Sequence, residues 1–215
     1  MELLAGKMYQ VSIMALPFLL AVTWREALRG YIAHRMGDWS VAQSGRLSAN
    51  PLNHADPVWT GLVPVVAFVV LNFPILLGQA KPIDIRPTNF KDINKGILYV
   101  AIAGPVALFL MAILWAYILR FGVGFGLTQQ DWVYQMSIAG LQLSCIFMVI
   151  GLLPIPGLDG GKILEYFLPP DIAQSFRAVE PYGFFIVIGI FIFAQQIIIG
   201  PASFIIGLVA VLVGV

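Results

Sequence analysis

Long apolar stretches, separated by short polar intervals, dominate the pattern of the chain. A helix needs about 20 predominantly apolar residues to cross a bilayer. Three stretches meet that length without difficulty: Ser12 to Arg35, Ile97 to Leu119 and Trp132 to Leu153. A further stretch, Val58 to Leu77, contains two prolines, Pro64 and Pro74. Because proline removes a helical hydrogen bond, this second stretch is predicted to be a kinked or irregular span.

The C-terminal part contains two shorter apolar runs, Phe184 to Ile199 and Ala202 to Val215, divided at Gly200-Pro201. Each is short for an independent span, which indicates that one of them is re-entrant or tilted. The polar intervals Trp39 to Pro57 and Gln79 to Phe90 are rich in turn residues and prolines, which favour short extended segments. We therefore expect an all-α polytopic membrane protein with five to six membrane segments and short extended loops.

Composition agrees with this pattern. The chain has 60% hydrophobic and 11% charged residues, and its mean hydropathy is +0.90. Residues 1–215 are predicted to form a single transmembrane domain. The net charge of +1 gives no support for nucleic-acid binding, and the lone Cys145 excludes an internal disulfide. The N-terminus lacks the basic region of a cleaved signal peptide, so we expect it to be retained.

The basic residues do not settle the orientation in the membrane. The interval Gln79 to Lys95 is the most basic loop and is predicted to be cytoplasmic. The interval Arg35 to Pro57 is also mildly basic, yet a spanning Val58 to Leu77 would place it on the opposite side. Aromatic residues near the segment ends, namely Trp115, Tyr117, Trp132 and Tyr134, are predicted to form interfacial belts.

Three ionisable residues, Arg25, Glu26 and Arg29, lie inside the first apolar stretch. Arg25 and Arg29 are four residues apart and share one helical face. Charges at this depth mark a functional site by default, since they are costly in hydrocarbon. A second unusual stretch, Pro154 to Gly161, combines prolines and glycines with Asp159, and such backbone must line a cavity or be buried in protein. Arg25, Glu26, Arg29 and Asp159 together are called the charge cluster below.

Several motifs, in a fixed order, resemble the site-2 protease family of intramembrane zinc metalloproteases, in particular its compact bacterial branch. These motifs are His34 to Asp38, Gly45 to Pro57, Gln79 to Pro82, Pro87 to Phe90, Ala103 to Pro105 and Leu152 to Gly161. The resemblance begins at about Phe18 and continues to the C-terminus.

The resemblance also identifies what has changed. Arg25 and Arg29 stand where the family has the two zinc-binding histidines of His-Glu-x-x-His, whereas Glu26 matches the general base and Asp159 the third ligand. Leu108 and Gly151 stand where the family commonly has asparagines that assist substrate binding. Arginine has no free lone pair to donate to a metal. The pattern is typical of a pseudoprotease, with no catalytic residue beyond a vestigial Glu26 and no metal or other cofactor.

We therefore expect a catalytically inactive site-2 protease homologue that serves as a binding or structural subunit of a membrane assembly. Its expected contacts are membrane lipid and one or more integral membrane proteins, and its expected location is the bacterial inner membrane. The charge cluster is expected to pair Arg25 or Arg29 with Asp159 and to tie the first span to the fourth. Two alternatives stay open: an active intramembrane zinc metalloprotease that cleaves transmembrane substrates, and a transporter that uses the cluster as an ion or proton relay.

Overall fold

The computed structural model describes residues 2–70 and 75–214, and within these residues every regular element is a helix. The prediction of an all-helical fold is confirmed. The long helices are α1 (Glu2–Met36), α4 (Ile93–Gly124), α5 (Trp132–Leu152) and α9 (Gln196–Val213). The shorter helices are α2 (Ser40–Gln43), α3 (Val63–Val69), α6 (Asp159–Phe167), α7 (Pro170–Arg177) and α8 (Gly183–Phe193). Single turns at Pro51–Asn53, Pro87–Asn89 and Glu180–Tyr182 and a π-helical turn at Pro57–Leu62 complete the set.

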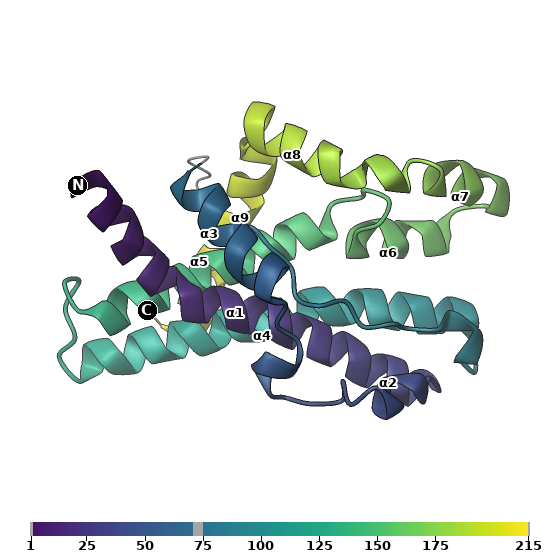
Figure 1. The fold of residues 1–215 in the computed structure, drawn as a ribbon, viewed down its shortest axis with the longest axis horizontal. Coiled ribbons are helices and arrows are strands. Elements are labelled where there is room, and N and C mark those ends of the chain that lie inside the picture. Colours follow the sequence, from purple (N-terminus) through teal and green to yellow (C-terminus); the bar gives the residue numbers. More distant parts are fainter. Residues whose placement is uncertain (1, 71–74, 215) are drawn as a thin grey trace.

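Helices α1, α4 and α5 pack along one another, and α9 covers α4 and α5 (Figure 1). Among the described residues, five helical stretches are long and apolar enough to cross a membrane: α1, α4, α5, α9 and the continuous region Pro170–Phe193. Asp92 begins α4 by accepting a hydrogen bond from the Lys95 amide at 3.1 Å. The protein thus has the architecture of an integral membrane protein.

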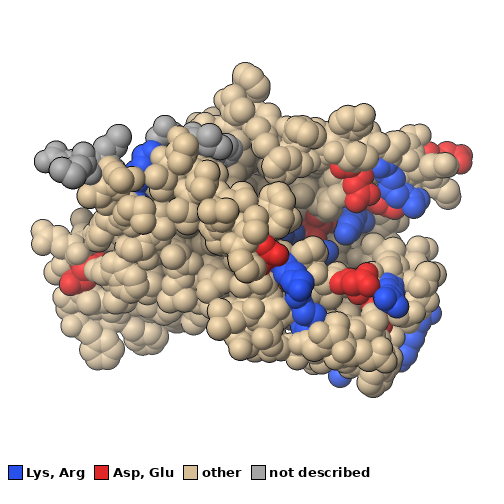
Figure 2. Space-filling view, in the orientation of Figure 1, with Lys and Arg blue, Asp and Glu red and all other residues tan. Residues whose placement is uncertain are grey.

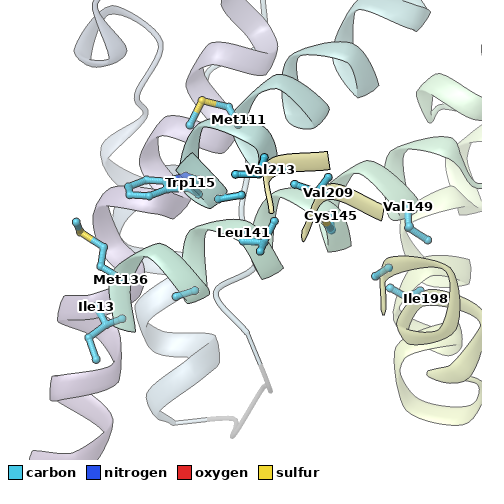
Figure 3. Packing of buried hydrophobic residues seen from close by; sticks show 14 of the residues in the cluster. Ile13, Met111, Trp115, Met136, Leu141, Cys145, Val149, Ile198, Val209 and Val213 are labelled. Carbon is cyan, nitrogen blue, oxygen red and sulfur yellow. The ribbon is translucent and has the colours of Figure 1, made fainter. Parts of the chain in front are cut away.

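The largest apolar core lies where α4, α5 and α9 meet (Figure 3). Trp115 belongs to this core with 2% of its surface exposed, and its ring lies against Gly140 of α5, where a Cβ atom would overlap it. The expectation that Trp115 belongs to an interfacial belt is therefore wrong. The close approach of two helices at a glycine creates the space for an indole in the interior. Tyr117 and Trp132 are exposed, as an interfacial position requires.

The second apolar stretch does not form the span predicted for Val58 to Leu77. Asp56 caps its start by accepting hydrogen bonds from the Val58 and Trp59 amides at 2.8 and 2.9 Å. The π-helical turn and α3 together cover 13 residues, Pro57–Val69, about 20 Å of helix against a hydrocarbon core of about 30 Å. Pro64 lies at the start of α3 and does not break it, and Pro74 lies outside the described residues.

The chain then returns alongside the turn that it has just left. Thr60 Oγ1 donates to the Gln79 carbonyl at 2.8 Å, and the Gln79 amide donates to the Trp59 carbonyl at 3.2 Å. Phe68 and Leu76 are buried in one small core with Phe18 of α1 and Leu143 of α5. The described part of the second stretch is therefore a short re-entrant element packed on α1 and α5.

Asp38 fastens the end of α1 to the next polar interval. Its carboxylate is fully buried and accepts hydrogen bonds from Ser40 Oγ at 2.6 Å, the Arg86 amide at 2.7 Å and Asn89 Nδ2 at 2.9 Å. Burial opposes ionisation of this carboxyl, but the hydrogen bonds outweigh it and lower the pKa of Asp38. Gly37 turns the chain with a φ of +118°, which favours glycine. The two basic intervals are thus held together at the same end of the molecule.

The C-terminal helices divide at a different place from the one predicted. The break between α8 and α9 falls at Ala194 and Gln195, where Ala194 leaves helical geometry with φ −143° and ψ 41°. Gly200 and Pro201 lie inside α9. The polar pair Gln195-Gln196 is the sequence signal for the break, since it interrupts an otherwise apolar run.

Candidate functional site

Three residues of the charge cluster lie on one stretch of α1, and the fourth begins α6. The turn between α5 and α6 positions Asp159 there: the Ile155 amide bonds to the Leu153 carbonyl at 2.7 Å and the Leu158 amide to the Ile155 carbonyl at 3.1 Å. Gly157 has a φ of +88°, a left-handed conformation that a side chain would strain. The proline- and glycine-rich motif thus folds as a compact turn that directs Asp159 toward α1.

The structure brings all four side chains of the charge cluster together. Arg25 Nη2 donates to Asp159 Oδ2 at 2.6 Å, and Arg29 Nη1 donates to Glu26 Oε1 at 2.6 Å. Arg29 Nε also lies 3.7 Å from the other carboxylate oxygen, Asp159 Oδ1. Asp159 is 2% exposed and Glu26 is 7% exposed, so both acids are desolvated and each faces a guanidinium.

Helix α4 makes room for the pair between Arg25 and Asp159 at Gly104. A Cβ atom on Gly104 would overlap the Asp159 carboxylate and would lie 3.2 Å from Arg25 Nε. Gly151 of α5 forms a second wall, where a Cβ atom would lie 3.7 Å from Asp159 Oδ2. Leu108, one turn after Gly104, is 1% exposed and packs in an apolar cluster. The two positions at which the family resemblance leads one to expect asparagine therefore offer no polar side chain to the cavity.

The charge cluster lines a cavity of about 270 Å³. Its other walls come from the returning chain at Gly78 to Ala80 and Pro82, from the Gly157-Leu158 turn, and from apolar side chains of α1, α5 and α8. Figure 2 shows charged side chains concentrated toward the end of the molecule that carries α2, α6 and α7. The cavity is therefore a polar pocket inside an otherwise apolar body.

Lys162 is a residue near the cluster that the sequence did not single out. Burial and the nearby Arg29 guanidinium lower the pKa of Lys162, and the surrounding carboxylates, that of Asp159 foremost, oppose this shift. Its spacing could have identified it, because Lys162 lies three residues after Asp159 and therefore on the same face of α6.

A zinc ion does not fit these residues. A structural or catalytic zinc site takes three or four nitrogen, sulfur or oxygen ligands from the protein. Glu26 and Asp159 supply two carboxylates, and each is already held by a guanidinium, which has no lone pair to offer. Within the described residues, no three His, Cys, Asp or Glu side chains are grouped so that they could hold a metal.

The two histidines lie elsewhere in the described structure. His34, at the end of α1, packs edge-on against Trp39 with ring centroids 4.6 Å apart. His54 is fully buried, and its Nε2 donates to the Ser48 carbonyl at 2.8 Å. The Lys81 amide in turn donates to the His54 carbonyl at 2.7 Å. His54 therefore orders the loop.

A larger groove of about 570 Å³ lies on the outer side of α1 and α4. Its lining is apolar apart from Trp24, Tyr31 and Ser48, and Trp24 Nε1 is already bonded to the Ala49 carbonyl at 3.1 Å. It contains no titratable acid or base that could carry chemistry at neutral pH, so the polar cavity is the candidate site.

Comparison with known proteins gives relatives of one kind. The chain is 29% identical over 191 residues to "Putative zinc metalloprotease YwhC" of Bacillus subtilis, covering 86% of this chain and 83% of the relative. It is 30% identical over 179 residues to "Putative zinc metalloprotease Rip2" of Mycolicibacterium smegmatis, covering 80% and 63%. The Rip2 of Mycobacterium tuberculosis strain H37Rv is 28% identical over 175 residues, covering 81% and 64%.

The chain thus spans slightly less than two thirds of the two Rip2 relatives and most of YwhC. No family model matches it, and no solved structure does. The relatives support the resemblance to the site-2 protease family and, together with the five apolar helices, an integral membrane protein.

Proposed function

We propose that this chain, a homologue of proteins named as zinc metalloproteases, is a site-2 protease homologue that does not cleave peptide bonds. It acts instead as a binding or structural subunit of a membrane protein assembly in the bacterial inner membrane. The names of the relatives support a protease-like membrane protein, and the loss of cleavage is inferred from the residues of the charge cluster.

The contact between Arg25 Nη2 and Asp159 Oδ2, 2.6 Å long, carries this proposal. In the family pattern these two positions would both bind the metal, whereas here one neutralises the other. Two guanidinium groups supply the two positive charges that a zinc ion would bring to two carboxylates. The pocket therefore reaches charge balance without a metal, and Glu26 has no metal-bound water to activate.

A subunit role is supported by the apolar surface that the C-terminal helices leave open. Only 11% of the most apolar 18-residue window within Pro170–Phe193 is buried, and Phe184, Phe185 and Phe193 are 66%, 68% and 88% exposed. In a membrane such a surface contacts lipid or the helices of a neighbouring protein.

Zinc content and peptide cleavage test the proposal that this protein does not cleave peptide bonds. Purified full-length protein is expected to hold no stoichiometric zinc and to leave a transmembrane peptide intact. The double variant Arg25→His with Arg29→His is the matched positive control, since it restores the ligand set with Asp159. One zinc per wild-type chain that is lost on Asp159→Asn would overturn the proposal.

The proposed subunit role is tested by measuring the mass of the complex that contains this protein. The complex is extracted from native membranes in polymer-bounded lipid discs and its mass is measured. A fixed mass larger than that of one chain, with constant composition across preparations, is expected. A chain that is extracted from the membrane as a free monomer would contradict the subunit role and leave the loss of catalysis unaffected.

A further inference from the structure

The end of the molecule where α1 ends and α4 begins gathers half of the lysines and arginines. It holds six of the chain's 12 such residues, and we call this surface the basic end; its members are Arg35, Arg46, Lys81, Arg86, Lys91 and Lys95. These residues come from separate intervals that the fold brings together. The Lys91 amide bonds to the Met36 carbonyl at 3.1 Å, and Arg46 Nη2 bonds to the Lys81 carbonyl.

The re-entrant element explains why both basic intervals lie at one end. A spanning second stretch would have separated them by the thickness of the membrane, but the chain returns from α3 to the level of Trp59. The two basic intervals therefore no longer predict opposite orientations in the membrane. The positive-inside rule now applies to their sum, which favours the cytoplasm for the basic end.

Acidic residues only partly neutralise the basic end. Asp84 lies 3.3 Å from Arg86 and Asp92 lies 3.5 Å from Lys95. Asp38 and Asp56 use their carboxylates to hold loops and a helix start. Three exposed cations have no ion pair within the part of the chain that the structure describes: Arg35, Lys81 and Lys91.

The basic end also lies at the ends of two helices that are long and apolar enough to span a membrane. Helix α1 ends at Met36 and α4 begins at Ile93, so the cations gather at the same end of both spans. Tyr31 and Tyr99, near those ends, are 47% and 49% exposed, and Trp39 is 67% exposed. Aromatic side chains in this position are characteristic of the interface between hydrocarbon and water.

We infer that the basic end is a binding surface for the anionic headgroups of phospholipids in the cytoplasmic leaflet. That leaflet carries a negative surface potential, and each lysine or arginine near it gains attraction to anionic lipid. The three unpaired cations supply the charge, and the exposed Trp39 and tyrosines fix the depth at which the charge is presented. This inference does not depend on whether the charge cluster is catalytic.

Quenching of tryptophan fluorescence by brominated lipid tests the inference. Full-length protein is reconstituted in phosphatidylcholine bilayers that contain either brominated phosphatidylglycerol or brominated phosphatidylcholine. We expect quenching to report a preference for phosphatidylglycerol of about fivefold for each cation engaged. The preference should fall as ionic strength rises from about 0.05 M to about 0.5 M, because salt screens exposed charges.

Charge-neutralising variants then locate the surface. The triple variant Arg35→Gln, Lys81→Gln, Lys91→Gln is expected to lose the preference, and the single variant Lys91→Gln should lose about fivefold if the triple variant does not fold. A matched control changes uncharged residues that are near the basic residues in sequence: Gln43→Ser, Thr88→Ser and Asn94→Ser. It should keep the preference.

Three results would overturn the inference. They are an unchanged preference in the charge-neutralised variants, a preference that does not respond to salt, and an unchanged preference after Trp39→Phe, which removes the exposed reporter from the basic end. Equal quenching by both brominated lipids in the wild-type protein would also reject it.

Discussion

Removal of the Arg25 side chain tests whether the charge cluster holds the fold together. In Arg25→Ala, the Asp159 carboxylate, 2% exposed, loses its partner at 2.6 Å. Helices α4 and α5 enclose the carboxylate on the sides of Gly104 and Gly151, so the charge stays largely buried although it lines the cavity. An unpaired buried charge is therefore left behind, which is the costly way to disrupt an ion pair.

The loss of stability in Arg25→Ala depends on the contacts that Asp159 keeps. Breaking a buried pair costs about 3–5 kcal/mol. Arg29 Nε stays 3.7 Å from the other oxygen of Asp159 and compensates in part, and the Arg25 side chain is itself 27% exposed. We therefore expect the lower end of that range, about 3 kcal/mol, or roughly 6–12 °C in Tm for a chain of this size.

Arg177→Ala is the matched control. Arg177 also forms a single ion pair, with Glu165 at 3.0 Å, but its side chain is 58% exposed. Exposed pairs contribute about 0–1 kcal/mol, so this variant should unfold within about 4 °C of the wild-type protein. Thermal unfolding of both variants in the same detergent, followed by circular dichroism, gives the comparison.

The double variant Arg25→Met with Asp159→Leu separates pairing from packing. If the cost of Arg25→Ala arises from the unpaired carboxylate, replacing both charges with apolar side chains should recover much of the lost stability. Equal Tm values for Arg25→Ala and Arg177→Ala would refute the structural role of the cluster. A double variant no more stable than Arg25→Ala would assign the loss to packing.

Three further outcomes are expected. Asp38→Asn should lower the free energy of unfolding by about 2 kcal/mol, since charge-assisted hydrogen bonds weaken. Because the pKa of Asp38 is lowered in the folded state, this difference in stability from wild type should be full above about pH 4 and shrink as the pH falls toward the lowered pKa. A difference that grows in acid would contradict this. Gly104→Ala should destabilise by about 2 kcal/mol because its methyl group would overlap the cluster, whereas Gly200→Ala, with open space around it, should be neutral or stabilising; similar unfolding of the two would reject the close approach. With the basic end in the cytoplasm, a membrane-impermeant maleimide added to intact cells should label Gln129→Cys but label Thr88→Cys only after permeabilisation, and the reverse pattern would invert the orientation.

Much of the architecture could be predicted from the sequence because the bilayer imposes a simple length rule. The apolar runs at Ile97 to Leu119 and Trp132 to Leu153 gave the positions of α4 and α5. In the structure α4 extends from Ile93 to Gly124, and α5 ends at Leu152. The position of Arg25 and Arg29 on one helical face is likewise fixed by helix geometry. These features depend on local sequence, so periodicity and hydropathy are sufficient to find them.

The re-entrant element could not be predicted from the same rules. Its course depends on tertiary contacts, such as Thr60 with Gln79 and the packing of Phe68 on Phe18, which hydropathy does not encode. The burial of Trp115 against Gly140 is similar, because it requires knowing that α4 and α5 approach closely at that level. The approach of Asp159 to Arg25 across 134 positions of sequence could be expected from the family resemblance, but composition and spacing do not determine it.

The re-entrant element also constrains the order of events during synthesis. Its core residue Phe68 packs with Phe18, which is already made, and with Leu143, which is made about 75 residues later. At about 5–20 residues per second, the ribosome needs on the order of 10 s to supply that partner. During this interval the re-entrant element, which does not cross the bilayer, contacts α1, but the face that will pack on α5 is still uncovered. Its final placement therefore depends on the arrival of α5, so a ribosome that stalls between α4 and α5 would release a chain whose second apolar stretch is free to insert wrongly.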